Sequence, residues 1–324
     1  MTTPEAGESP APGRGPGGVE EAVEAVEQAL SEFADSAKHV ADAVNKKAGR
    51  DLFAATGVAI VLLGLAGVSL AFAPWGFAVI VAAAVVGAQI EIGQVFHQQR
   101  GITVVAGPLW VGSAVFVLGG YGVHMGGFPV LTPTTFMIWT AGLTAVAVLV
   151  WRLTGPITGY VADVTATLFL LVYPCLLVSS LVLILAGDDG PAKIAIFIVA
   201  VAATDTGGHA AGVLFGKHQF SPRISPKKYW EGVAGSYVLS AGLVILMTVF
   251  MLHEAWWRGL VLSVVVVTAA ILGDLVESVI KRDVGVKDMG KFLPGHGGIM
   301  DRVDSYVLAA FPAWLVMNWL LSYV

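Results

Sequence analysis

The sequence predicts an all-α polytopic membrane protein with about nine transmembrane helices. Three observations support this fold class. Charged residues make up only 13% of the 324 residues, which is about half of their share in soluble domains. The mean hydropathy is +0.79. Apolar runs long enough to cross a hydrocarbon core of roughly 30 Å recur along the chain, beginning with AATGVAIVLLGLAGVSLAFA at 54–73.

The first fifty residues differ from the rest of the chain. Residues 1–17 are rich in Pro, Gly and Ser and predict a disordered tail. Residues 18–50 predict an acidic amphipathic cytoplasmic helix, because apolar residues recur at steps of three and four. This helix could bind a partner or form a coiled coil, or it could rest on the protein or fray in solvent. The apolar residues that define its face are Val19, Val23, Val26, Leu30 and Phe33.

The apolar runs divide the remainder into two regions. Residues 51–190 form the N-terminal transmembrane helices, and residues 191–324 form a C-terminal transmembrane region that is expected to be catalytic, because most polar clusters begin near residue 204. The nine predicted spans lie near residues 54–73, 76–97, 102–120, 130–150, 163–186, 191–214, 232–253, 257–281 and 303–323.

The basic residues predict the orientation of these spans. If the N-terminus lies in the cytoplasm, nearly all Lys and Arg residues between the spans fall on the cytoplasmic side. Only Lys193 and Arg258 then lie outside, next to acidic residues. Cytoplasmic loops carry such an excess of Lys and Arg. The sequence therefore predicts an N-in, C-out topology.

Three polar segments converge on the predicted cytoplasmic side. Residues 203–232 leave the sixth span, residues 273–282 end the eighth, and residues 281–305 connect the eighth span to the ninth. Because their acids, bases and glycines lie at neighbouring helix ends, they predict a cytoplasm-facing polar cavity in the C-terminal half.

Three aspartates are candidates for a metal site in this cavity. Asp274 interrupts an apolar helix, where an acid normally faces a polar cavity and marks a functional site. Asp301 and Asp304 project from one side of a helix and repel each other unless a cation lies between them. Oxygen ligands favour Mg²⁺, and a lone cysteine, Cys175, excludes a site built from several thiolates. A packing role for Asp274, or the helix dipole for the other pair, is the alternative.

Basic residues surround these acids and suit a substrate with several phosphates. Their cations can neutralise the part of the phosphate charge that a bound metal ion does not neutralise. Positive-inside topology alone explains about half of them. Gly295, Gly297 and Gly298 allow backbone N–H groups to approach an anion. His296 is a catalytic candidate, whereas His209 fits a hydrogen-bonded interfacial histidine better. The basic residues are Lys217, Arg223, Lys227, Lys228, Lys281, Arg282, Lys287, Lys291 and Arg302.

Residues 278–304, SVIKRDVGVKDMGKFLPGHGGIMDRVD, resemble the signature of the phosphatidate cytidylyltransferases, also called CDP-diacylglycerol synthases. The polar segment from Asp205 to Gly232, with its SPKK and WEG motifs, resembles the second polar loop of that family. The resemblance covers roughly residues 190–324. The chain departs from the family pattern at Gly207, Gly208, His209 and Tyr229.

The resemblance implies an enzyme that transfers the cytidylyl group of CTP to phosphatidate in a Mg²⁺-dependent reaction, forming CDP-diacylglycerol and pyrophosphate. It implies a second cation such as K⁺, a homodimer, and a multi-pass protein of the inner (plasma) membrane whose site faces the cytoplasm. The partners are CTP, phosphatidate and the bilayer, with no nucleic acid. The implied metal ligands are Asp274, Asp301 and Asp304, and the other implied catalytic residues are Lys287, Asp288 and His296. The implied substrate-binding residues are Asp205, Ser225, Lys227, Lys228, Lys281, Arg282, Gly297, Gly298 and Arg302.

Two other functions use the same features. A kinase of the polyprenol or phytol kinase type would also combine membrane-embedded acids with a nucleotide and Mg²⁺. An ion-coupled transporter would use Glu91, Asp163 and Asp274 as an intramembrane relay. The transporter predicts broken helices in two matching halves, whereas the polar residues here concentrate in one half.

Overall fold

The structure, a computed structural model, describes residues 61, 64–126, 131–290 and 297–321. These residues belong to one compact unit of the chain. The predicted tail at 1–17 and the predicted helix at 18–50 lie outside the described residues. Most of the first predicted span lies outside them as well, although residues 64–72 are helical.

The chain is a helical, polytopic membrane protein. Within the described ranges, eight helical segments are long and apolar enough to cross a bilayer, and each coincides with one of the last eight predicted spans. The predicted count of nine stays a prediction, since the first span is mostly outside these ranges. The segments are α3 (Pro74–Arg100), α4 (Ala106–Gly126), α5 (Pro133–Arg152), a composite helix over Tyr160–Leu185, α8 (Gly190–Phe215), α9 (Trp230–Met251), α10 (Trp256–Val284) and α11 (Met300–Leu320).

Several helix ends differ from the predicted span ends because polar residues can continue a helix beyond the hydrocarbon. The helix α10 extends three residues past its predicted end and stops at Gly285, which adopts a left-handed conformation with φ 79°. Glycine is the preferred residue at this C-terminal position, because it has no Cβ atom that would strain the left-handed conformation. The helix α4 begins at Ala106, not at residue 102, because α3 ends at Arg100 and is followed by Gly101, with φ 65°, and a non-helical linker.

The composite helix contains a widened turn. It consists of α6 (Tyr160–Leu170), the π-helical segment η1 (Leu171–Leu176) and α7 (Leu177–Leu185). Pro174 lies inside η1 and lacks the N–H that a regular helix needs at this position. A π-helical turn inside a helix accommodates such an interruption.

A short hairpin is the exception to the predicted all-α structure. The strands β1 (Gln219–Ser221) and β2 (Ser225–Tyr229) pair antiparallel between α8 and α9. The ring of Phe220 packs edge-on against that of Trp230, with 4.7 Å between the centroids. His218 Nδ1 lies 2.7 Å from Glu231 Oε1, so the base of the hairpin is closed by an ionisable pair. The hairpin gives the basic segment around Lys228 a defined position.

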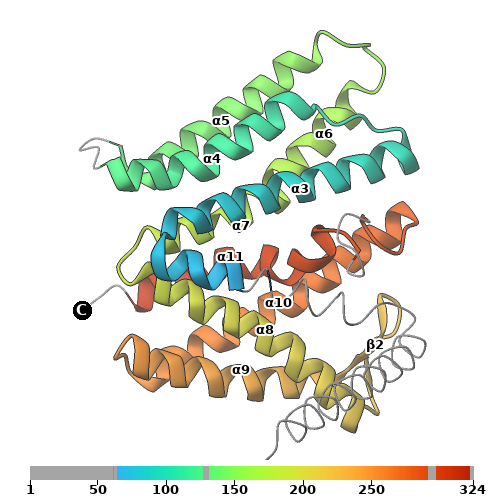
Figure 1. Cartoon of the computed structure of the whole chain (residues 1–324). Coiled ribbons are helices and arrows are strands. Elements are labelled where there is room, and N and C mark those ends of the chain that lie inside the picture. The colour runs from blue at the N-terminus through green and yellow to red at the C-terminus, as the bar shows by residue number, and fades with distance from the viewer. Residues whose placement is uncertain (1–60, 62–63, 127–130, 291–296, 322–324) are drawn as a thin grey trace, which may run out of the picture. The chain divides into compact units, whose positions relative to one another are not determined.

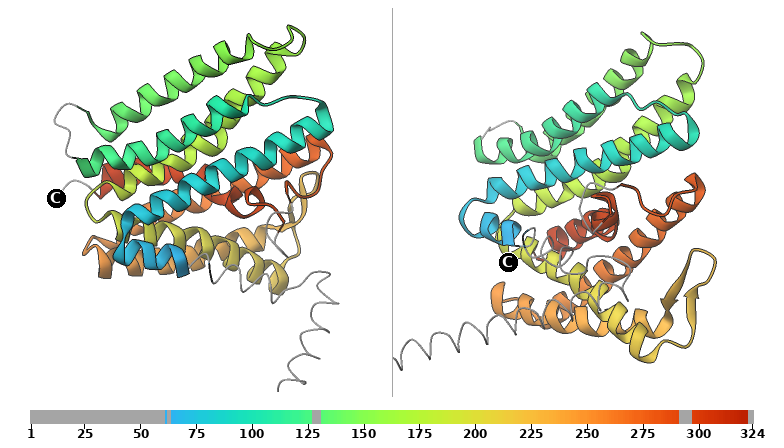
Figure 2. Two further views of the ribbon diagram at one scale, coloured as in Figure 1. Left: turned by 45° about the horizontal axis from the view of Figure 1, so that its top comes forward. Right: turned by 45° about the vertical axis from the view of Figure 1, so that its right-hand side comes forward.

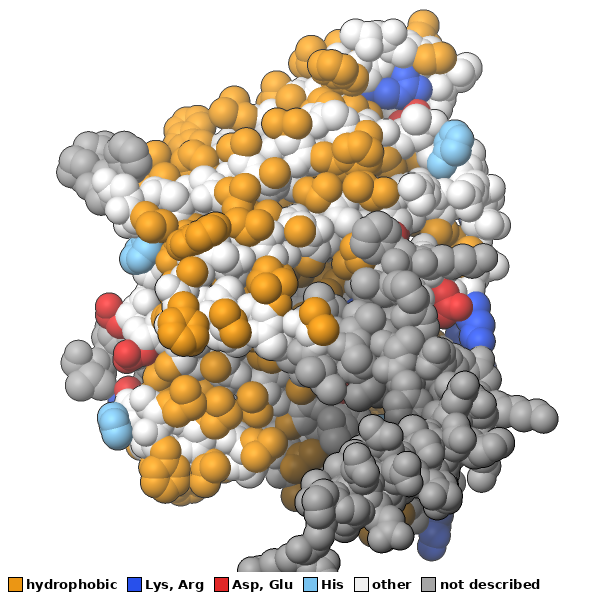
Figure 3. All heavy atoms as spheres, in the orientation of Figure 1, with side chains coloured by type: hydrophobic (Ala, Val, Ile, Leu, Met, Phe, Trp, Pro, Cys, Tyr) orange, Lys and Arg blue, Asp and Glu red, His pale blue; other side chains and the backbone are white. Residues whose placement is uncertain are grey.

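The helices pack most extensively as the pairs α8 with α9, α10 with α11, and α4 with α5 (Figures 1 and 2). Buried apolar side chains of α3, α7, α8 and α11 form the centre, among them Ile92, Leu181, Phe197 and Met317. Hydrophobic side chains also cover the face that α3, α4 and α5 present in Figure 3, as expected for a surface in contact with lipid.

Glycines allow α8 and α9 to approach closely. A Cβ atom added to Gly207 would lie 2.6 Å from the carbonyl oxygen of Gly235, and one added to Gly208 would lie 2.6 Å from Ser236 Oγ. Close approach through small residues is typical of helix pairs in membranes. Gly207 and Gly208 therefore allow the packing of α8 against α9.

Candidate active site

A polar cavity of about 390 Å³ lies where the C-terminal part of α8, the hairpin, the start of α9, the C-terminal half of α10 and the start of α11 meet. The predicted polar cavity in the C-terminal half is thus present. His209 and Tyr229 also line it. Its charged lining residues are Asp205, Lys227, Lys228, Asp274, Asp301, Arg302 and Asp304.

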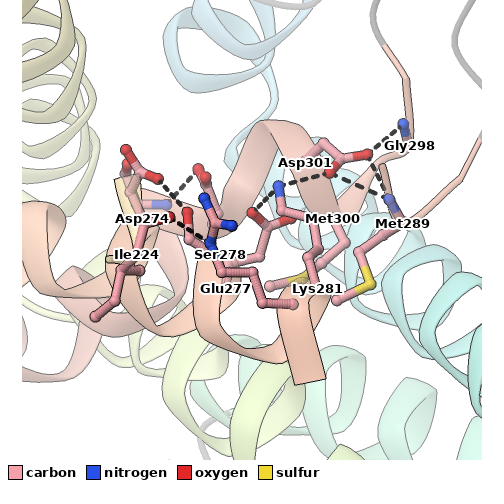
Figure 4. A network of polar contacts seen from close by, with 12 residues as sticks. Ile224, Asp274, Glu277, Ser278, Lys281, Met289, Gly298, Met300 and Asp301 are labelled. Carbon is pink, nitrogen blue, oxygen red and sulfur yellow. Dashed lines mark hydrogen bonds and ion pairs between the residues drawn. The ribbon is translucent and has the colours of Figure 1, made fainter. Parts of the chain in front are cut away.

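Asp274 connects α10 to the hairpin. Its Oδ2 forms an ion pair with the ammonium group of Lys228 on β2, and its Oδ1 accepts a hydrogen bond of 3.3 Å from Ser278 Oγ one turn along the helix. Both partners of the ion pair are partly exposed to the cavity. A carboxylate in an apolar helix therefore has a cation and a hydroxyl group as its immediate neighbours (Figure 4).

Asp301, in the first turn of α11, holds the loop that precedes this helix. Its Oδ2 accepts hydrogen bonds from the backbone N–H groups of Gly298 at 2.9 Å and Met289 at 3.0 Å. Lys281 Nζ lies 3.0 Å from Oδ1. Three donors thus converge on one carboxylate, as Figure 4 shows, and the carboxylate fixes both ends of the connection between α10 and α11.

Lys281 joins two buried acids. It forms one ion pair with Asp301 and a second with Glu277, one turn earlier on α10. The side chain of Glu277 is fully buried, so an ion pair is needed to keep it charged there. Through Lys281, α10 is thus tied to α11, whereas Asp274 and Arg282 contact the hairpin segment.

Asp304 and Asp205 complete the acidic part of the cavity. Asp304 Oδ1 accepts a hydrogen bond of 2.6 Å from the Ser305 N–H group, and Asp205 projects from α8. Together with Asp274 they offer carboxylate oxygens to one cavity. This donor chemistry fits a hard cation such as Mg²⁺. Within the described part of the chain, however, no three acidic, His or Cys side chains are close enough to form a metal cluster.

Several predicted site residues lie away from this cavity. Lys287 and Asp288 are exposed in the α10–α11 connection. Ser225 begins β2, and Arg282 donates from Nε to the Ile224 carbonyl oxygen, which anchors the hairpin to α10. His296 lies outside the described residues. Gly297 adopts φ +84°, which glycine tolerates, and Gly298 supplies the N–H group that binds Asp301.

The three acids of the transporter hypothesis occupy separate networks. Asp163 Oδ2 lies 2.9 Å from Arg152 Nε, and its Oδ1 accepts a hydrogen bond from the Thr103 N–H group. Glu91 accepts a hydrogen bond from the Met300 N–H group, whereas Asp274 pairs with the hairpin. The described structure therefore does not connect them as a relay.

A second cavity, of about 600 Å³, lies beside the polar one and is mainly apolar. Side chains of α3, η1, α7, α8 and α11 line it, including Phe77, Val81, Pro174, Phe197 and Val307. Asp205 and Arg302 line both cavities. A polar and an apolar cavity therefore meet at one acid and one base.

Comparisons with known proteins identify the family of this chain. The sequence profile described as "Cytidylyltransferase family" matches residues 53–320. The chain is 36% identical to a phosphatidate cytidylyltransferase of Mycobacterium leprae over 288 residues, which are 84% of this chain and 89% of the relative. It is 38% identical to one of Mycobacterium bovis over 291 residues, 84% and 90% of the two chains. A shorter match of 105 residues at 46% identity links it to one of Staphylococcus saprophyticus, covering 32% of this chain and 40% of that protein. The resemblance seen in the polar segments is thereby confirmed, and the chain belongs to the cytidylyltransferase family.

Proposed function

We propose that this protein transfers the cytidylyl group of CTP to phosphatidate, forming CDP-diacylglycerol and pyrophosphate. The relatives named phosphatidate cytidylyltransferase support this reaction. One observation of the structure supports it most directly, which is the meeting of a polar and an apolar cavity at Asp205 and Arg302. A nucleoside triphosphate and a phosphorylated lipid need such a pair of neighbouring sites.

Each cavity matches one substrate. Lys227, Lys228 and Arg302 give the polar cavity cations that can bind phosphates by charge-assisted hydrogen bonds. The apolar cavity offers aliphatic and aromatic side chains to acyl chains, as lipid-binding sites generally do. In this arrangement the phosphate of phosphatidate lies at Arg302, next to the triphosphate.

The reaction needs charge compensation more than it needs a base. A phosphate oxygen of phosphatidate attacks the α-phosphorus of CTP, a new P–O bond forms, and the bond between the α- and β-phosphates breaks to release pyrophosphate. A phosphate monoester has a second pKa of about 6 and is largely a dianion at neutral pH. The lysines and Arg302 reduce the repulsion between the two anions as they approach.

The cavity acids would hold the metal that this chemistry uses. We assign the binding of Mg²⁺ mainly to Asp274 and Asp304, because Asp301 is held by two backbone N–H groups and by Lys281, whereas the partners of Asp274 are the side chains of Lys228 and Ser278, which can rotate away. Asp301 contributes only through lone pairs that its donors leave over. When bound, Mg²⁺ supplies positive charge to the triphosphate. A second cation such as K⁺ belongs to the same proposal.

The proposal includes the placement in the membrane. With nine spans, N-in and C-out, the cavity faces the cytoplasm of an inner (plasma) membrane, where CTP is available. The basic residues at the cavity end support this orientation, since Lys227, Lys228, Lys281 and Arg282 would lie in the cytoplasm. A homodimer is proposed from the family resemblance alone.

Isotope transfer tests the reaction. Purified protein in detergent receives phosphatidate, Mg²⁺ and CTP that carries ³²P at either the α- or the γ-phosphate. We expect label in the lipid only from α-labelled CTP, with one pyrophosphate released per lipid formed. Transfer of the γ-label would instead identify a kinase, and a folded wild type without any transfer would refute the proposal.

The metal assignment has its own test. Asp274→Asn and Asp304→Asn should raise the Mg²⁺ concentration needed for half-maximal activity by about tenfold or more, because each removes a charged ligand. A chelator should abolish the wild-type activity, and added Mg²⁺ should restore it. Unchanged Mg²⁺ dependence in both variants would place the metal elsewhere.

A further inference from the structure

Glu91 is a buried acid that does not line either cavity. It lies on α3, in the N-terminal group of helices, and only 6% of its surface is exposed. Its Oε2 accepts a hydrogen bond of 2.9 Å from the backbone N–H group of Met300, which is 209 residues away in the chain. A carboxylate in an apolar helix needs compensating contacts, and this one finds its contact at the catalytic end of α11.

The contact satisfies the N-terminus of α11. Met300 is the first residue of this helix, where backbone N–H groups have no partner within the helix. Ile299, at the N-cap position, provides no side-chain hydrogen bond. A negative charge at this end also interacts favourably with the helix dipole. Glu91 therefore supplies from α3 the cap that the sequence of α11 lacks.

The surrounding glycines fit the carboxylate closely. A Cβ atom added to Gly298 would lie 2.5 Å from Glu91 Oε2, and one added to Gly290 would lie 2.4 Å from Oε1. One turn earlier on α3, a Cβ at Gly87 would lie 2.5 Å from Ile299 Cδ1. Glycines on both sides of the contact thus leave room for the acid and for Ile299.

The same short segment carries the cavity residues. The Gly298 N–H group binds Asp301 in the first turn of α11, and Arg302 and Asp304 follow directly along the helix. A displacement of Met300 would move all three side chains relative to Asp274 on α10. The position of Glu91 thereby determines where the acids and the arginine of α11 lie in the cavity.

We propose that Glu91 is a positioning residue for the reaction, through which the N-terminal helices hold the catalytic turn of α11 in place. This inference rests on the proposed function for its kinetic consequences, and on the contact with Met300 for its structural ones. Glu91 touches no substrate in this arrangement, so its effect is on the rate of the chemical step.

Two variants and one control test this role in the full chain reconstituted in nanodiscs. Glu91→Gln keeps an oxygen that can accept the Met300 hydrogen bond, whereas Glu91→Leu fills a similar volume without an acceptor. The control is Gln89→Leu, because Gln89 is fully buried on the same helix but binds Ser113 and the Leu170 carbonyl oxygen. It removes a buried polar contact of α3 without touching α11.

Hydrogen exchange gives a readout that does not depend on activity. In Glu91→Leu, amide exchange at Met300 should accelerate by about tenfold or more, as expected for the loss of one buried hydrogen bond. Exchange at Met300 should stay close to the wild type in Glu91→Gln and in Gln89→Leu. Equal exchange at Met300 in wild type and Glu91→Leu would overturn the inference, even if the wild type makes no CDP-diacylglycerol.

Kinetics separate positioning from simple stability. The kcat of Glu91→Leu, measured per folded protein, should fall by up to about 100-fold, with KM for CTP changed much less, and Glu91→Gln should recover most of it. Gln89→Leu should keep its kcat even if its Tm falls equally. The same loss of kcat in Gln89→Leu would reduce Glu91 to a packing residue, and a kcat of Glu91→Gln as low as that of Glu91→Leu would overturn the role given to the Met300 hydrogen bond. An inactive wild type would refute the proposed reaction, while the exchange data would still decide the role of Glu91.

Discussion

Lys281 Nζ lies 3.0 Å from Asp301 Oδ1, and this contact joins α10 to α11 beside the polar cavity. The lysine also pairs with the fully buried Glu277. One cation therefore compensates two acids from two helices. The acids and the base of the signature segment are mutually dependent, which makes the network sensitive to the loss of any single member.

Replacing Lys281 by Met should lower the free energy of unfolding by about 3–5 kcal/mol, because it leaves buried carboxylates without a partner. Adding Glu277→Gln should recover part of the loss by removing one orphaned charge. Thermal unfolding in detergent measures both effects. Lys217→Met is the control, since this lysine is exposed and should change stability by less than about 0.5 kcal/mol. Equal stability of Lys281→Met and the wild type would contradict the network.

Lys228 is expected to bind the triphosphate. Its ammonium group faces the cavity and pairs with Asp274. Lys228→Met should raise KM for CTP by about 10- to 100-fold, the cost of a hydrogen bond to a charged group, and Lys228→Arg should retain much of the affinity. Initial rates at varied CTP concentration provide the measurement. A KM for CTP that Lys228→Met leaves unchanged would assign the triphosphate to other residues.

The close approach of α8 and α9 makes Gly207 sensitive to a single methyl group. Gly207→Ala should destabilise the protein by about 1–3 kcal/mol, because the new Cβ meets backbone atoms of α9. Gly242→Ala is a matched control on α9, where a Cβ meets nothing within 4 Å. Unfolding temperatures of the two variants should therefore differ. If both variants unfold at the same temperature as the wild type, α8 and α9 are less tightly packed than described.

The apolar cavity should be specific for the lipid substrate. Ala202 lines this cavity from α8, and Ala202→Phe should raise KM for phosphatidate by about tenfold while KM for CTP changes little, because the ring takes space from acyl chains. Ala210→Phe, an exposed position on the same helix that lies outside both cavities, is the control. An effect confined to CTP would mean that the two cavities have been assigned to the wrong substrates.

The sequence predicts the transmembrane segments well, because a span needs about twenty apolar residues and this length is visible in the chain. It also predicts most of the charged lining of the cavity. Asp274, Asp301 and Asp304 stand out, since acids in apolar helices are costly and seldom lack a role. The resemblance of residues 278–304 to the phosphatidate cytidylyltransferase signature indicates which reaction to expect.

Contacts between segments that are distant in the chain could not be predicted from the sequence. Glu91 is visible in the sequence as an acid in an apolar run, but nothing in the run indicates that its partner is the backbone of Met300. The inward orientation of Asp301 depends on backbone N–H groups of Met289 and Gly298, which leave no side-chain signal. The hairpin is too short and too polar for an alternating apolar pattern to reveal it.

The junction of the two cavities at Arg302 also affects how the products depart. Under the proposed reaction, CDP-diacylglycerol carries a lipid tail that can leave only toward the bilayer, whereas pyrophosphate is soluble in water alone. The two products therefore use opposite exits from one point. Neither has to wait for the other to clear its path, so their order of release is set by affinity at Arg302 and its neighbours and not by the shape of a shared channel.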